Sequence, residues 1–146
     1  GVPPSHDSCF LGRHNDVYLS PRKVIGSLGG VEILEAPRNG TKGMCCGAGG
    51  ARMWMEESIG KQVNVERSQE LIATGAERVA TACPFCYIMI DDGVKGEGLD
   101  DDAVKVADIA MHVLEALERS EAPVAVTTSA STSATGGAGG AAPFEE

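Results

Sequence analysis

The chain has 146 residues, of which 42% are hydrophobic and 4% aromatic, so it suits one domain with an aliphatic core. Its formal net charge of −9 argues against binding to nucleic acid or to an anionic membrane surface, because both depend on Lys and Arg. No segment approaches about 18 consecutive apolar residues, so we expect no direct insertion of this chain into a membrane. The odd number of cysteines favours a reducing cytosolic setting over a secreted disulfide framework.

Helical and strand-like segments alternate in the first half of the chain. Ser20-Pro21 is typical of a helix start, and this helix should run to about residue 28 and end at Gly29-Gly30. The short β-branched run 31–34 predicts a strand. A long helix is predicted from about Ala51 to Ala73, although Gly60 inside it costs about 1 kcal/mol relative to Ala.

The second half continues the alternation. Gly75 should end the long helix, and residues 78–82 indicate a buried strand that leads directly into Cys83. A helix opened by Pro84 and running to about residue 94, a strand at 104–106 and a helix at 107–118 should follow in that order. Strands that alternate with helices predict an α/β fold, with a mainly parallel sheet flanked by helices.

The five cysteines fall into three groups, namely Cys9, the adjacent pair Cys45-Cys46, and Cys83-Pro-Phe-Cys86. Cys83 follows a predicted strand and begins a helix, and the adjacent pair follows the strand at 31–34 by a longer loop. Cys9 would follow any strand at the N-terminus, although Pro3-Pro4 disfavour one. Because ligands bind outside the carboxyl ends of the strands in open parallel sheets, we expect the three groups to converge on one site there.

An iron–sulfur cluster is the first hypothesis for this site. Five thiolates exceed the four ligands of a tetrahedral zinc ion, and the adjacent Cys45 and Cys46 have difficulty pointing at one small ion. They can more readily bind different irons of a larger cluster. The glycines Gly47, Gly49 and Gly50 would let backbone N–H groups approach sulfur closely. These glycines and all five cysteines are therefore the predicted cofactor-binding residues.

Two other kinds of site remain open. Four of the five cysteines would suffice for a zinc-stabilised interaction module with no redox role. Alternatively, Cys83 and Cys86 could form a CxxC dithiol oxidoreductase, because a helix start lowers the pKa of a thiol. That second alternative would leave the other three cysteines without a role.

Polar residues near the cysteines have candidate roles of their own. His6 comes just before Cys9, and it is either a catalytic proton donor beside the cluster or a histidine that hydrogen-bonds within a turn. Arg13 and Arg52 would either offset the negative charge of the site or lie in solvent.

Three motifs together resemble those of the cysteine-rich CCG domain. They are residues 6–13, His-Asp-Ser-Cys-Phe-Leu-Gly-Arg, then Cys45-Cys46-Gly47-Ala48-Gly49-Gly50, then Cys83-Pro84-Phe85-Cys86. This domain occurs in heterodisulfide reductase, in anaerobic glycerol-3-phosphate dehydrogenase and in lactate-utilisation iron–sulfur proteins. Residues 50–57 resemble more closely the large actinobacterial iron–sulfur oxidoreductases related to the electron-transfer-flavoprotein dehydrogenase of fatty-acid oxidation. The resemblance covers about residues 5–118.

The resemblance implies a cofactor and a reaction type. In heterodisulfide reductase the CCG cysteines hold a non-cubane 4Fe–4S cluster that cleaves a disulfide, and this chain has Cys9, Cys45, Cys46, Cys83 and Cys86 at the ligand positions. Other members pass electrons to quinones or flavoproteins. The expected function is therefore electron transfer within an oxidoreductase, either heterodisulfide reductase-like or between a flavoprotein and quinone.

The resemblance also implies partners, because the family normally carries two CCG modules and this chain has one. We expect residues 1–120 to be the C-terminal module of a larger protein, inactive alone, followed by a disordered tail at 121–146. The implied partners are a second CCG module, a ferredoxin-type iron–sulfur domain and an electron-transfer flavoprotein. The expected location is cytoplasmic, at the inner face of the membrane through the parent protein.

Overall fold

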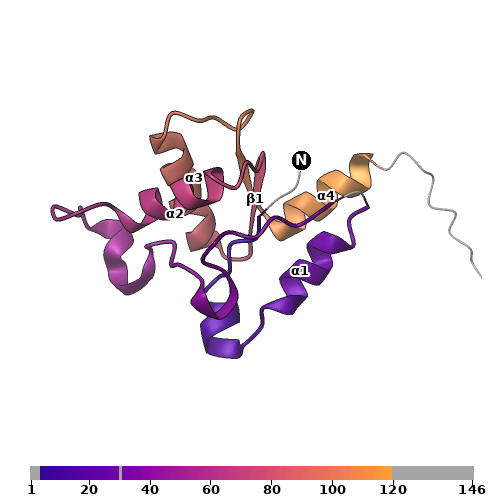
Figure 1. Cartoon of the computed structure of the whole chain (residues 1–146), viewed down its shortest axis with the longest axis horizontal. Coiled ribbons are helices and arrows are strands. Elements are labelled where there is room, and N and C mark those ends of the chain that lie inside the picture. The colour runs from indigo at the N-terminus through magenta and orange to yellow at the C-terminus, as the bar shows by residue number, and fades with distance from the viewer. Residues whose placement is uncertain (1–3, 30, 120–146) are drawn as a thin grey trace, which may run out of the picture.

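A computed structural model describes residues 4–29 and 31–119, and it has the predicted α/β class (Figure 1). The elements in chain order are the π-helical turn η1 (Phe10–His14), α1 (Leu19–Gly26), the 3₁₀ turns η2 (Gly40–Lys42) and η3 (Gly49–Trp54), α2 (Val63–Ile72), β1 (Arg78–Thr81), α3 (Pro84–Gly96), β2 (Lys105–Asp108) and α4 (Ile109–Arg119). Helices α2 and α3 lie on one side of the strands, and α1 and α4 lie on the other. The predicted tail at 121–146 lies outside the described residues.

The sheet consists of parallel pairings in the part of the chain that the structure describes. Strand β1 pairs with β2, and the register places Val79 opposite Val106. On the other edge of β1, Ser5 forms a parallel bridge with Ala80, supported by an N–H···O bond from His6 to Ala80 of 2.9 Å. Pro4 lacks an N–H group but accepts a 3.0 Å bond from the Ala80 N–H. The N-terminal segment therefore runs beside β1 in the same direction.

The segment from β1 to α4 agrees with the sequence-based prediction. Cys83 adopts an extended conformation at the N-cap of α3, and Pro84 occupies the first helical position, where its fixed φ suits a helix start. Helix α3 then crosses back to β2, which leads directly into α4. Two parallel strands are usually joined by a helix that crosses from the end of one to the start of the next, so the order of these elements could be predicted.

Two predicted elements are wrong. The helix expected from Ala51 to Ala73 is instead the turn η3, an irregular stretch, and α2, because Ala51 and Gly60 have φ of +62° and +78°, outside the helical range. Residues 31–34 are described but form no strand, since none of them pairs with the described strands. Helix α1 begins one residue earlier than its predicted cap at Ser20 and ends at Gly26.

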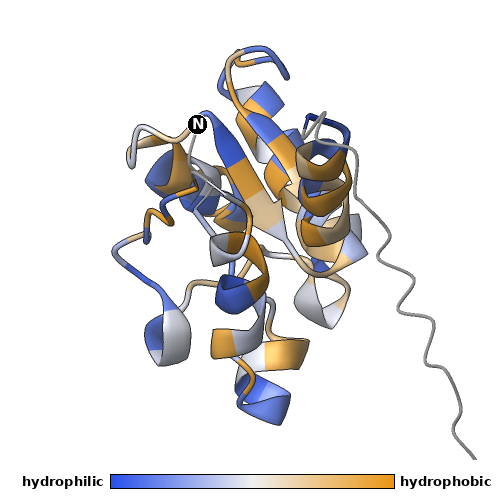
Figure 2. Cartoon of the chain, turned by 90° about the vertical axis from the view of Figure 1, so that its right-hand side faces the viewer, coloured by the Kyte–Doolittle hydropathy of each residue, from blue (hydrophilic) through white to orange (hydrophobic). Residues whose placement is uncertain are grey.

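The core lies between the strands and the pair α2–α3. Its fully buried members include Leu71, Val79 and Ile90, and Cys46 and Cys86 belong to the same cluster. Figure 2 shows hydrophobic residues along the central strands and hydrophilic residues at several outer turns. Within the described residues, none of the helices is long and apolar enough to span a membrane.

Candidate metal or cluster site

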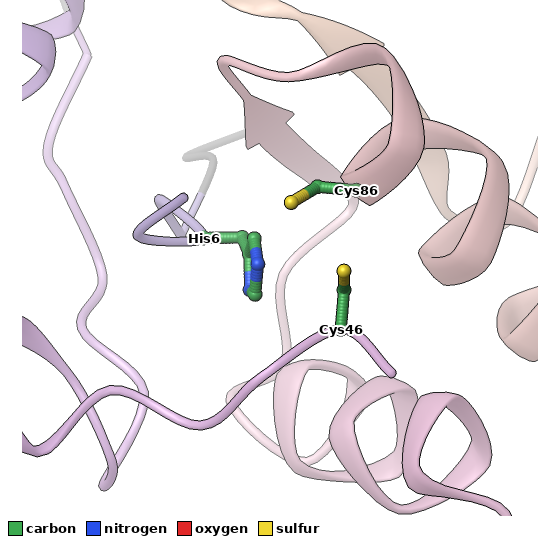
Figure 3. A group of neighbouring side chains, drawn as sticks. All are labelled: His6, Cys46 and Cys86. Atoms are coloured by element: carbon green, nitrogen blue, oxygen red, sulfur yellow. The ribbon is translucent and has the colours of Figure 1, made fainter. Parts of the chain in front are cut away.

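Side chains from three separate segments meet beside the carboxyl end of β1. His6 comes from the N-terminal segment, Cys46 from the loop before η3, and Cys86 from the first turn of α3 (Figure 3). One ligand atom of each lies within 4.8 Å of the others, and all three residues are buried. The N-terminal segment and β1 run side by side in the same direction. His6 and Cys86, which follow them in the chain, therefore meet at the same edge of the sheet.

A small cavity opens at this point, and most of the predicted ligands line it. Cys45, Cys46 and Cys86 line its inner part, and the exposed Cys9 lies at its outer part. Cys83 is half-buried at the N-cap of α3 and is not among the described residues that line the cavity. The geometry thus brings four of the five cysteines and His6 to one space, with Cys83 three residues along the chain from Cys86.

Ion pairs and hydrogen bonds fix the loop that carries the cysteine pair against the N-terminal segment. The Asp7 carboxylate accepts bonds of 2.6 and 3.0 Å from Arg22 and one of 2.7 Å from the Gly40 N–H. Burial alone would raise the pKa of Asp7, but these hydrogen bonds hold it below its ordinary value. The Arg13 guanidinium donates a 2.6 Å bond to the Gly43 carbonyl, just before the cysteine pair. Asp7 and Arg13 therefore position both sides of the cavity.

The glycines after the cysteine pair differ in their environment. Gly47 is buried with φ of +92°, and its N–H donates to Cys45 Sγ at 3.3 Å. The N–H groups of Gly47 and Gly49 both favour the thiolate of Cys45 and lower its pKa. Gly49 and Gly50 are exposed. Gly47 is thus the glycine that the packing of this loop requires most.

The clustered sulfurs favour their protonated form when no cation is present. The pKa of Cys45 is raised by the neighbouring Cys46 sulfur and by burial. Cys45 lowers the pKa of Cys46, but the Cys86 sulfur and burial outweigh this and raise it to about 11. Bound cations would reverse this preference, because thiolates are the metal-binding form. Cation binding at this site should therefore release protons.

His6 is a buried, neutral histidine at the inner end of the cavity. Its side chain is only 2% exposed, and burial together with the nearby Arg67 charge lowers its pKa to about 3. Arg67 Nε donates to His6 Nδ1 at 3.2 Å. The His6 ring is therefore hydrogen-bonded to α2 and also faces the cysteines, and its role as a proton donor stays a prediction.

The donor set suits a metal ion or an iron–sulfur cluster. Thiolates with one imidazole are ligands for zinc, and groups of Cys thiolates hold iron–sulfur clusters. Ser8 Oγ is buried, lines the same cavity, and has no hydrogen-bond partner among the described residues. Such a hydroxyl is expected to donate to a bound group, because buried polar atoms are rarely unpaired. The residues present therefore fit an anionic, sulfur-rich occupant.

Sequence reasoning missed several residues of this region. Arg67 gave no signal because it lies on α2, inside a segment predicted to present an apolar face. Ser8 and Asp7 lie within the run 6–13 and could have been found as polar residues adjoining Cys9. Of the two predicted arginines, Arg13 lines the cavity. Arg52 does not line it and instead forms an ion pair with Glu57, with an N···O distance of 2.5 Å.

Several known proteins are similar to this chain in sequence. The chain is 43% identical over 104 residues to the "Probable iron-sulfur-binding oxidoreductase FadF" of Bacillus subtilis, covering 71% of this chain and 15% of that protein. It is 43% identical over 120 residues to the EtfAB:quinone oxidoreductase of Syntrophomonas wolfei, covering 77% and 16%. It is 37% identical over 112 residues to one subunit of the dihydromethanophenazine:CoB–CoM heterodisulfide reductase of Methanosarcina barkeri, covering 77% and 27%.

The chain thus spans less than a third of the length of these three relatives. No solved structure gives a match. The CCG family profile, described as a cysteine-rich domain, matches residues 5–91, which include all three cysteine groups and more than half of the chain. The chain therefore belongs to the CCG cysteine-rich domain family.

Proposed function

We propose that this chain binds an iron–sulfur cluster of the 4Fe–4S type and transfers electrons within a larger oxidoreductase. The observation that carries the proposal is the meeting of Cys9, the pair Cys45-Cys46 and Cys86 at one cavity, from segments far apart in the sequence. Relatives named as an iron–sulfur-binding oxidoreductase, an EtfAB:quinone oxidoreductase and a component of heterodisulfide reductase support it. Cys83, at the carboxyl end of β1, is the proposed fifth ligand.

Each group around the cavity has a separate task in this proposal. The cluster, when bound, supplies one-electron transfer, in which one electron enters from a donor and one leaves to an acceptor. Cys45, Cys46 and Cys86 hold it from the side of the core, which excludes water. Backbone N–H groups at Gly47 and Gly49 stabilise negative charge on Cys45. The exposed Cys9 marks the side from which a redox partner approaches.

The proposed partners are other parts of a larger redox protein or complex. They are a second CCG module, a ferredoxin-type iron–sulfur domain and an electron-transfer flavoprotein, with quinone or a disulfide as the terminal acceptor. Several large apolar side chains are exposed in the described part of the chain, including Phe10 at 67% and Trp54 at 78%. We propose that these side chains contribute to the contact with the partners. The proposed location is the cytosol, because a reducing compartment keeps the cysteines as thiols that can bind a cluster.

A zinc-stabilised interaction module is the second candidate. It is favoured by the compact group of His6, Cys46 and Cys86, which offers three ligand atoms within 4.8 Å of one another. A third cysteine would supply the fourth ligand of a tetrahedral site, and the remaining two cysteines would then be dispensable.

Single replacement of the adjacent cysteines separates the two candidates. We expect Cys45→Ser and Cys46→Ser each to lose most of the visible charge-transfer absorption after anaerobic loading with iron and sulfide, since both sulfurs bind the cluster. The zinc candidate predicts instead that at least one of these variants keeps wild-type zinc content and stability. Retention of the full iron-dependent spectrum by either variant would contradict the ligand assignment.

A further inference from the structure

We propose that Arg67 is a positioning residue that fixes His6 as a hydrogen-bond donor to the sulfur atoms of the bound cluster through Nε2, so that His6 is not a metal ligand. The inference rests on the proposed function for the identity of the cluster. The orientation of the His6 ring, however, is a property of the chain itself and can be measured without any metal.

The Arg67 side chain is fully buried and held from three sides. Its Nη1 donates to the Arg38 carbonyl and to Glu70 Oε2, both at 3.0 Å, while its Nε donates to His6 Nδ1 at 3.2 Å. Its side chain is 0% exposed, and Nη2 has no hydrogen-bond partner within the described residues. Burying a guanidinium with an unpaired donor is unfavourable, so packing alone does not account for this residue.

The hydrogen bond from Arg67 determines which His6 nitrogen carries the proton. Arginine stays protonated and can only donate, so His6 Nδ1 must accept. A neutral ring that accepts at Nδ1 carries its proton at Nε2. The ring lines the cavity, with one of its nitrogens within 4.8 Å of the Cys46 and Cys86 sulfurs. Because Arg67 occupies Nδ1, Nε2–H is the group that remains for a bond to an occupant of the cavity.

This arrangement disfavours ligation of a metal by His6. Ligation through Nε2 would require its proton to leave or to move to Nδ1, where it would face the Arg67 N–H. A donor to sulfur stabilises the more negative, reduced form of a cluster and thereby raises its reduction potential. Arg67 would thus tune the potential through His6, in addition to the weaker effect of its own charge.

The tautomer of His6 is the first test, and it uses the unmodified chain. In ¹⁵N-labelled, metal-free protein we expect His6 to show a protonated Nε2 and an unprotonated, hydrogen-bonded Nδ1 by NMR. After cluster loading, the ¹⁵N hyperfine coupling of His6 in pulsed EPR should be weak. Protonation at Nδ1, or the strong coupling of a nitrogen bound to iron, would overturn the proposal.

A double-mutant cycle then tests whether Arg67 acts through His6. Loss of one hydrogen bond to a charged sulfur should shift the reduction equilibrium about tenfold, or about 59 mV for a one-electron couple. We expect Arg67→Met and His6→Leu each to lower the cluster potential by this amount, and the double variant to lower it little further. Arg38→Met, which removes an exposed arginine paired to the same Glu70, is the matched control and should leave the potential unchanged.

An undiminished effect of Arg67→Met in the His6→Leu background would contradict the proposal, because Arg67 would then act by its charge alone. If Arg67→Met does not fold, the NMR and EPR measurements on the wild-type chain still show whether His6 carries its proton at Nε2 and whether it binds iron. If no cluster assembles in any variant, the proposed function fails, whereas the His6 tautomer in metal-free protein tests the present inference separately.

Discussion

Gly47 shows most directly how single residues shape the cysteine loop. A Cβ atom at this position would lie 3.1 Å from Val63 Cβ and 3.2 Å from the Asn64 nitrogen at the start of α2. The backbone also has φ of +92°, which L-residues rarely adopt. Gly47 therefore allows the cysteine pair to lie against α2 while its own N–H points at Cys45.

Replacing Gly47 by Ala should destabilise the protein and weaken metal binding. We expect the free energy of unfolding to fall by about 2 kcal/mol, from the backbone strain and the close contact with α2. Urea denaturation measures this change. Gly49→Ala is the matched control, because no atom lies within 4 Å of its Cβ position. An equal loss in both variants would show that the packing against α2 is not the cause.

At the residue scale, the cysteines could be predicted but their polar surroundings could not. Adjacent cysteines beside glycine and a CxxC before a helix indicate thiolate chemistry without any tertiary information. Arg67 could not be found in this way, because the buried face of α2 carries Asn64, Arg67 and Ser68 as well as Leu71. Apolar periodicity does not identify a helix face that is buried through polar groups.

Among the elements, the contact between α2 and α3 is unusually close. At Gly93 of α3, a Cβ atom would lie 2.3 Å from Ser68 Oγ and 2.8 Å from the Asn64 carbonyl oxygen. The Ser68 hydroxyl donates to the Ile90 carbonyl at 3.1 Å across the same contact. This contact holds α3, and therefore Cys86, at a fixed distance from α2.

We predict that Gly93→Ala pushes α2 and α3 apart and lowers the free energy of unfolding by about 2 kcal/mol. Gly96→Ala on the same helix is the control, since its Cβ would meet no atom within 4 Å. Alanine at that position should be neutral or stabilising by up to about 1 kcal/mol, because glycine is a poor helix former. Thermal or urea unfolding that ranks the two variants in the opposite order would contradict the packing argument.

The predictable elements are those in which local and tertiary signals agree. The order β1, α3, β2 and α4 follows from a buried strand, a Pro-led helix and a second apolar strand. The prediction of one long helix over 51–73 was wrong because the apolar spacing continues across Gly60. The φ of +78° at Gly60 interrupts the helix there. The apolar run 31–34 failed because strand formation needs a pairing partner, which sequence pattern alone does not supply.

For the whole molecule, parallel strand order is what assembles the site. The N-terminal segment and β1 run side by side, so the residues that follow each of them, His6 to Cys9 and Cys83 to Cys86, emerge at the same edge. The Gly-rich loop is then fastened to this edge through Asp7 and Arg13. The convergence of three cysteine groups was predictable from this topology, whereas the position of Cys83 outside the cavity lining was not.

The metal content of the anaerobically loaded chain tests the central claim most directly. The full chain should be purified without oxygen, loaded with iron and sulfide in the presence of competing zinc, and analysed for all three. We predict brown protein with iron and acid-labile sulfide in equal amounts, about four of each per chain. Colourless protein that holds stoichiometric zinc and no iron would contradict the account.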